Sequence, residues 1–110
     1  MDAVKRDQRR RARVREWHKA NRDKVLLYRR RYRLKTEYGI TEDDYQRMLA
    51  SQQGACAVCL KPFSGSPHVD HCHATGRVRG LLCHLCNTAL GKLNDDPERL
   101  RRAAAYVEGV

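Results

Sequence analysis

Two Cys-x-x-Cys pairs constrain the fold of this chain more than any other feature. The first pair is Cys56 and Cys59, and the second is Cys83 and Cys86. Four thiolates at this spacing form the tetrahedral ligand set of a structural zinc ion. The region after residue 39 has few large apolar side chains, and structural zinc contributes on the order of 10–16 kcal/mol to the folding of small domains. We therefore predict that zinc controls whether this region folds.

The cysteine count and the hydropathy pattern suggest where the protein works. The chain has five cysteines, and Cys72, which lies outside the two pairs, is interpreted as a spare thiol. No apolar run approaches the ~20 residues of a membrane span, and no signal-peptide core follows Met1. We therefore expect no membrane partner and a reducing, cytoplasmic location, where thiols bind metal rather than form disulfides. Disulfide pairing among the four paired cysteines is the alternative.

Positive charge is concentrated at one end of the chain. The formal net charge is +10, and it lies entirely within residues 1–38 because the remainder carries equal numbers of basic and acidic side chains. Such a basic block attracts a polyanion, most commonly nucleic acid. The arginines expected to contact DNA there form two triplets, Arg9, Arg10 and Arg11, and Arg29, Arg30 and Arg31. The alternative is a solvated basic helix that only keeps the protein in solution.

The basic arm is predicted to be helical. From residue 3 to about residue 35 it contains no Gly or Pro and is rich in helix-forming residues. Asn21 is a candidate cap, so the pattern allows either one long helix or two that join near this residue. Gly39 would end the arm as a C-terminal cap. One helix face carries an apolar stripe formed by Val25, Tyr28 and Tyr32.

The remainder of the chain is predicted to be α+β. The expected elements are a helix at about 41–52, strands at 68–71 and 77–82, and a helix at about 84–90 that Gly91 stops. A final helix to about residue 107 is expected to begin with Asp96 as its cap. Three divisions follow. Residues 1–38 form a DNA-binding or dimerisation arm, residues 39–95 form a zinc-bound domain, and residues 96–110 form a C-terminal helix.

A second set of reactive residues lies between the cysteine pairs and just after them. The run His68-Val69-Asp70-His71-Cys72-His73 is followed by Gly76-Arg77-Val78-Arg79-Gly80-Leu81-Leu82-Cys83-His84-Leu85-Cys86-Asn87. These residues resemble the recombination endonuclease VII family of HNH (His-Me finger, ββα-metal) nucleases, over about residues 38–93. The resemblance implies a small zinc-stapled ββα-metal domain. The chain departs from the family at Cys72, where Asp is frequent, and at Leu90, where the junction-resolving member carries an acidic residue.

The resemblance implies catalytic roles for four residues. Asp70 and Asn87 would bind Mg²⁺ through hard oxygen ligands, with Mn²⁺ as a substitute. His71, next to Asp70 on an extended strand, would be the general base that deprotonates the attacking water. His73 would assist at the metal or the phosphate. The alternatives are a surface pair for Asp70 and His71, a helix cap for Asn87, and an ordinary loop residue for His73.

Two further arginines are expected to contact the DNA backbone. Arg77 and Arg79 alternate with Val78, so both would face one side of the strand.

Together these features predict a Mg²⁺-dependent DNA endonuclease that nicks one strand per active site, and cutting both strands would need a homodimer. Its location would be the host-cell cytoplasm if a phage encodes it. The alternative is a zinc-stapled DNA-binding protein without catalysis.

Overall fold

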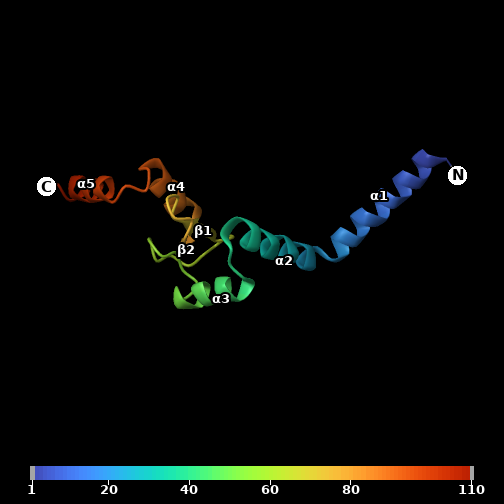
Figure 1. Ribbon diagram of the computed structural model, residues 1–110, viewed down its shortest axis with the longest axis horizontal. Coiled ribbons are helices and arrows are strands. Elements are labelled where there is room, and N and C mark those ends of the chain that lie inside the picture. Colours follow the sequence, from blue (N-terminus) through green and yellow to red (C-terminus); the bar gives the residue numbers. More distant parts are fainter. Residues whose placement is uncertain (1, 110) are drawn as a thin grey trace. The chain divides into compact units, whose positions relative to one another are not determined.

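The computed structural model describes residues 2–109 and is shown in Figure 1. The chain divides into two compact units, Met1–Glu42 and Asp43–Val110. The fold is α+β, as predicted, because the helices of both units accompany one small antiparallel sheet in the second unit. The domain boundaries expected at residues 38 and 95 stay predictions. Among the described residues, no helix is both long enough and apolar enough to cross a membrane.

The basic arm forms two helices rather than one. Helix α1 (Ala3–Ala20) begins at Asp2, whose Oδ1 accepts a hydrogen bond from the Lys5 backbone N–H at 2.8 Å. It ends at Asn21, whose side-chain amide donates to the Trp17 carbonyl at 2.8 Å. Helix α2 (Arg22–Arg33) follows directly. Asn21 therefore separates the helices, which confirms the two-helix alternative.

A wide helical turn ends the arm. The segment η1 (Leu34–Tyr38) is π-helical, and Gly39 closes it with φ of +67°. The Ile40 N–H donates to the Leu34 carbonyl at 3.1 Å. A left-handed φ is the conformation that glycine adopts at helix C-termini without steric cost. The predicted capping role of Gly39 is thus confirmed.

The second unit is built around a short two-stranded sheet. Strand β1 (His68–His71) pairs antiparallel with β2 (Val78–Leu82), and helix α4 (His84–Lys92) contacts β1. Leu81 and Leu82 of β2 are buried, as is Tyr45 on helix α3 (Glu42–Ser51). Helix α5 (Pro97–Glu108) starts where Asp96 Oδ1 accepts from the Glu98 N–H at 2.9 Å, as the sequence predicted.

A side-chain amide ties the end of α3 to the sheet. Gln52 Nε2 donates to the carbonyls of Ala55 and Leu81, and Gln52 Oε1 accepts from the Leu81 N–H at 2.9 Å. The neighbouring Gly80 permits this approach, because a Cβ there would stand only 3.1 Å from Gln52 Oε1. The link places the first cysteine pair, which follows α3, beside β2.

Several predicted boundaries differ from the structure by one or two residues, and two of them lie next to the site. Strand β2 begins at Val78 rather than Arg77, and α4 continues through Gly91 to Lys92 instead of stopping at Leu90. The reversal after α4 uses Asn94 and Asp95, which have φ of 56° and 53°. The Asp95 N–H donates to the Leu90 carbonyl at 2.9 Å. Since asparagine and aspartate tolerate left-handed backbone, the helix does not need glycine to end it.

Candidate functional site

The four paired cysteines meet in one cluster. The sulfur atoms of Cys56, Cys59, Cys83 and Cys86 all lie within 4.8 Å of one another. The Cys59 and Cys83 sulfurs are 3.9 Å apart. A tetrahedral zinc ion with Zn–S bonds of about 2.3 Å separates its sulfur ligands by about 3.8 Å. The cluster therefore fits the predicted zinc site in both donor type and spacing.

Backbone hydrogen bonds position the first cysteine of each pair. In the first pair, the Cys56 N–H donates to the Lys61 carbonyl at 3.0 Å, and the Val58 N–H points at Cys56 Sγ at 3.5 Å. In the second pair, Cys83 is the N-cap of α4 and its sulfur accepts from the Cys86 N–H at 3.5 Å. Backbone donors of this kind stabilise thiolates and orient them toward a metal.

The pKa values of two of the cluster's thiols, Cys56 and Cys86, are shifted in opposite directions. Burial alone would raise the pKa of Cys56, but backbone hydrogen bonds from Cys59 and Cys83 outweigh it and lower that pKa to about 6. Burial and a hydrogen bond with Cys83 raise the pKa of Cys86 to about 12. One thiolate therefore forms readily while another resists ionisation. A bound divalent cation would favour the thiolate form of both residues, because it neutralises the negative charge that accumulates in the cluster.

The predicted reactive residues lie next to a bulge in the sheet. Asp70 is opposite Gly80, but His71 is opposite Val78, so Arg79 is an extra residue in β2. A bulge interrupts the alternation of side chains along a strand. The spacing of Arg77 and Arg79 therefore does not establish that they share a face. Arg77 is exposed and lies just before β2.

Arg79 is engaged by two carboxylates. Its Nε donates to Asp70 Oδ2 at 2.7 Å, and its Nη2 donates to Asp70 Oδ1 at 2.9 Å and to Asp95 Oδ2 at 3.3 Å. Hydrogen bonding to Asp70 outweighs burial and raises the pKa of Arg79. The Asp70 side chain is only 13% exposed, so this ion pair is partly desolvated. The role of Arg79 as a DNA contact stays a prediction.

The histidines of the site lie at the end of β1 and just beyond it. The ring centroids of His71 and His73 are 4.9 Å apart, in an edge-to-face arrangement. His73 Nε2 also lies 3.4 Å from Asp95 Oδ2. Asn87 lies on the first turns of α4, the helix that contacts β1. Asp70, His71 and Asn87 thus come from two contacting elements, while their catalytic roles stay predictions.

Asp95 belongs to this group, although sequence reasoning did not identify it. Its carboxylate contacts Arg79 and His73, and its side chain is 17% exposed. The acid follows Asn94 after a helix, a pattern that indicates only a turn. A weak signal was available in Leu90, where the resemblance places an acidic residue in the junction-resolving member, because a site without that acid could draw a carboxylate from elsewhere.

The arginine triplets of the arm differ in their partners. Arg10 and Arg11 pair with Asp7 at 3.3 and 2.8 Å, and Arg30 pairs with Glu42 through both ends of its guanidinium. Arg9, Arg29 and Arg31 are exposed and have no acidic partner within residues 2–109. Exposed ion pairs are weak enough for a phosphate to replace the carboxylate. Their contact with DNA stays a prediction.

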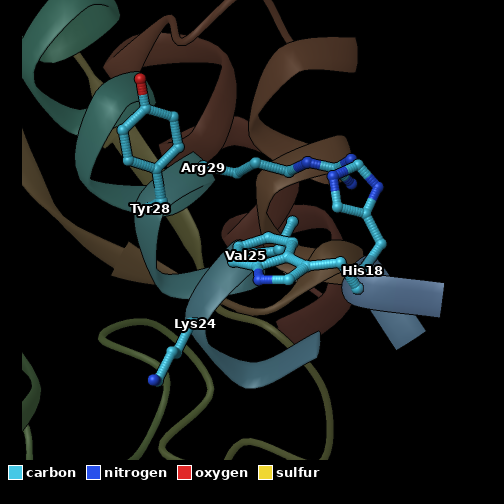
Figure 2. A pocket seen from close by; sticks show the side chains of 6 residues that line it. His18, Lys24, Val25, Tyr28 and Arg29 are labelled. Atoms are coloured by element: carbon cyan, nitrogen blue, oxygen red, sulfur yellow. The ribbon is translucent and has the colours of Figure 1, made fainter. Parts of the chain in front are cut away.

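The two tyrosines of the apolar stripe of α2 face solvent. Tyr28 and Tyr32 stack with ring centroids 6.5 Å apart, as expected for one helix face, but they are 70% and 61% exposed. Figure 2 shows Val25, Tyr28 and Arg29 lining a hollow together with His18 of α1. The arm therefore exposes aromatic rings and cationic side chains side by side.

Comparisons with known proteins identify the family of the chain. The profile of the family described as "Recombination endonuclease VII" matches residues 31–109, more than half of the chain. The "Gene 59 protein" of Mycobacterium phage L5 is 41% identical over 78 residues, which are 68% of this chain and 48% of that protein. The protein of the same name from Mycobacterium phage D29 is also 41% identical over 78 residues, covering 47% of its length. The chain thus spans about half the length of these relatives.

Proposed function

The chain belongs to the recombination endonuclease VII family, and from this premise we propose that it is a Mg²⁺-dependent HNH endonuclease that hydrolyses DNA phosphodiester bonds. The observation that carries the proposal is the order of the elements at the site. Strand β1 ends in Asp70 and His71, β2 returns antiparallel, and α4 with Asn87 contacts β1. The cysteine cluster lies at the start of α4.

The donor groups fit a hard divalent cation. Asp70 offers a partly buried carboxylate, which accepts two hydrogen bonds from the Arg79 guanidinium. Asn87 offers an amide oxygen. Mg²⁺ takes such oxygen ligands in small numbers and retains several waters. When bound, it would supply charge stabilisation at the phosphate oxygens.

The histidines supply the proton chemistry in this proposal. His71 would accept a proton from the attacking water, for which a neutral imidazole nitrogen is suited near neutral pH. His73 lies against His71 and would contact the phosphate or orient its neighbour. The exposed Arg77 would bind the DNA backbone. Cleavage of both strands would require two copies, and the exposed face of α2 is available for pairing.

One observation favours a second candidate function. Both oxygens of Asp70 are occupied by Arg79, which is how a structural ion pair would look in a non-catalytic, zinc-stapled DNA-binding protein. In that case the Asp70–Arg79 ion pair would stabilise the β-bulge, and the arm would provide all of the DNA affinity. The phage origin of the relatives favours action in the host-cell cytoplasm under either function.

A plasmid assay separates the two functions. Zinc-loaded protein incubated with supercoiled DNA and Mg²⁺ should produce open circles first, because one active site cuts one strand. Linear and four-way-junction DNA in parallel reactions identify the preferred substrate. Reactions with excess EDTA, added briefly so that zinc is retained, should show no cleavage. DNA binding with no nicking in Mg²⁺ or Mn²⁺ would instead establish the non-catalytic function.

The arm should contribute phosphate contacts. Deleting residues 1–20 removes α1 at its natural boundary, together with Arg9, Arg10 and Arg11. For each phosphate interaction that the deletion removes, the plot of log K against log[salt] should flatten by about 0.9. Binding to a short duplex by fluorescence anisotropy at several salt concentrations measures this slope.

A triple variant provides the matched control for the deletion. Arg9→Gln, Arg10→Gln and Arg11→Gln together keep the helix while removing three charges, since glutamine has similar helix propensity. The slope of the triple variant should fall between those of the parent and the deletion. An unchanged slope and affinity in both proteins would show that the arm serves another purpose, such as subunit pairing.

A further inference from the structure

We propose that Asp95 is a positioning residue of this site, which retains the Arg79 guanidinium beside the site when Asp70 binds a metal ion. The inference rests on the proposed function, since it concerns the Mg²⁺ site formed by Asp70. It assigns a task to a residue that lies outside the motif His68 to His73 and beyond the helix that carries Asn87.

The need for a second partner follows from the contacts of Asp70. Arg79 uses both oxygens of that carboxylate, at 2.7 and 2.9 Å. A cation bound at Asp70 would lie next to the Arg79 guanidinium, and the two positive charges would repel each other. Arg79, whose side chain is 38% exposed, would then lose charge-assisted hydrogen bonds to Asp70 and could turn toward solvent unless another anion accepts it. The guanidinium thus competes with the metal for Asp70.

Asp95 is placed to be that second anion. Its Oδ2 already accepts from Arg79 Nη2 at 3.3 Å, the same nitrogen that donates to Asp70. Only a short movement of the guanidinium would transfer this nitrogen fully to Asp95. Arg79 would stay at the edge of the site, with its other donors free to bind a DNA phosphate.

The backbone holds Asp95 in this position. Its φ of 53° is left-handed, and its N–H donates to the Leu90 carbonyl at 2.9 Å. The same Oδ2 lies 3.4 Å from His73 Nε2. A residue held in a sparsely populated conformation, with its carboxylate only 17% exposed, is already oriented for its two partners. Asp95 thus supplies a carboxylate close to the site, whereas position 90 on α4 is a leucine and supplies none.

A double-mutant cycle on metal binding tests the inference without measuring cleavage. Mn²⁺ affinity is measured by electron paramagnetic resonance on the full, zinc-loaded chain in the absence of DNA. Asp95→Asn should weaken Mn²⁺ binding about tenfold, within the range found for coupled neighbours. Arg79→Met should tighten it, because the competing cation is gone. In the Arg79→Met background, Asp95→Asn should change the affinity less than about twofold.

Two controls define the site and the charge effect. Asp70→Asn should abolish this Mn²⁺ binding, which assigns it to Asp70. Asp96→Asn removes one negative charge at the adjacent residue and preserves the cap of α5, because asparagine is also a good N-cap. It should leave Mn²⁺ affinity unchanged within about twofold. Asparagine at position 95 tolerates left-handed backbone, and an unchanged zinc content and unfolding midpoint confirm the fold of each variant.

Each remaining outcome overturns the inference in a distinct way. Equal Mn²⁺ affinity in Asp95→Asn and the parent would contradict it while leaving the proposed function intact. Equal weakening by Asp95→Asn with and without Arg79 would mean that Asp95 acts on the metal directly. Absence of Asp70-dependent Mn²⁺ binding in the parent protein would remove both this inference and the proposed metal site.

Discussion

A Cys86→Ser variant is expected to lose zinc and most of the folded structure of residues 43–109. The buried side chains of that region are Tyr45, Cys56, Leu81 and Leu82, a core too small to fold alone. Structural zinc is worth on the order of 10–16 kcal/mol in such domains, which exceeds the stability of most small folds. Elemental analysis gives the zinc content, and the dispersion of amide resonances reports the fold.

The fifth cysteine offers a matched control for this experiment. Cys72 lies outside the four-sulfur cluster, so Cys72→Ser makes the same chemical change without removing a ligand. It should retain one zinc ion per chain and the parent's resonance dispersion. A Cys86→Ser protein that is zinc-free yet well folded would show that the metal is dispensable for the fold.

A His71→Ala variant is expected to cleave DNA 10²–10⁴-fold more slowly than the parent, roughly the contribution of a positioned general base. His71 ends β1 beside the bulge and lies outside the buried core, so its loss should not unfold the protein. Initial rates of plasmid nicking under saturating Mg²⁺ measure the effect. Anisotropy with a short duplex should show unchanged DNA affinity, which separates loss of chemistry from loss of binding.

The control for His71 comes from another histidine of the same unit. His84 is exposed and begins α4, and His84→Ala should nick DNA at nearly the parental rate when its zinc content is normal. If His71→Ala cleaves as fast as the parent, the general base lies elsewhere. The contact between the His71 and His73 rings makes His73→Ala the next variant to measure.

Features encoded by neighbouring residues were accessible from the sequence. The cysteine pairs, the Asn21 break, the Gly39 cap and the Asp96 cap all depend on contacts within a few positions of the chain. Local hydrogen bonds and ligand spacing are nearly independent of the rest of the fold. The predicted α+β class and the four-sulfur cluster are also confirmed.

Features that depend on how elements pair were not accessible. The bulge adds Arg79 to β2 opposite a regular β1, and nothing in the order of Arg77, Val78 and Arg79 indicates it. The exposure of the Tyr28 and Tyr32 face likewise depends on what packs against α2, and helical spacing alone cannot reveal a partner.

The same distinction explains the site. Asp70, His71 and Asn87 could be proposed from residue type and order, because the first two lie between the cysteine pairs and Asn87 directly follows the second pair. Asp95 could not, since its carboxylate reaches Arg79 and His73 only after α4 passes Gly91 and the chain reverses in left-handed backbone. The sequence determines residue chemistry and spacing. The contact between Asp95 and the bulged Arg79 forms only when the helix has packed against the sheet.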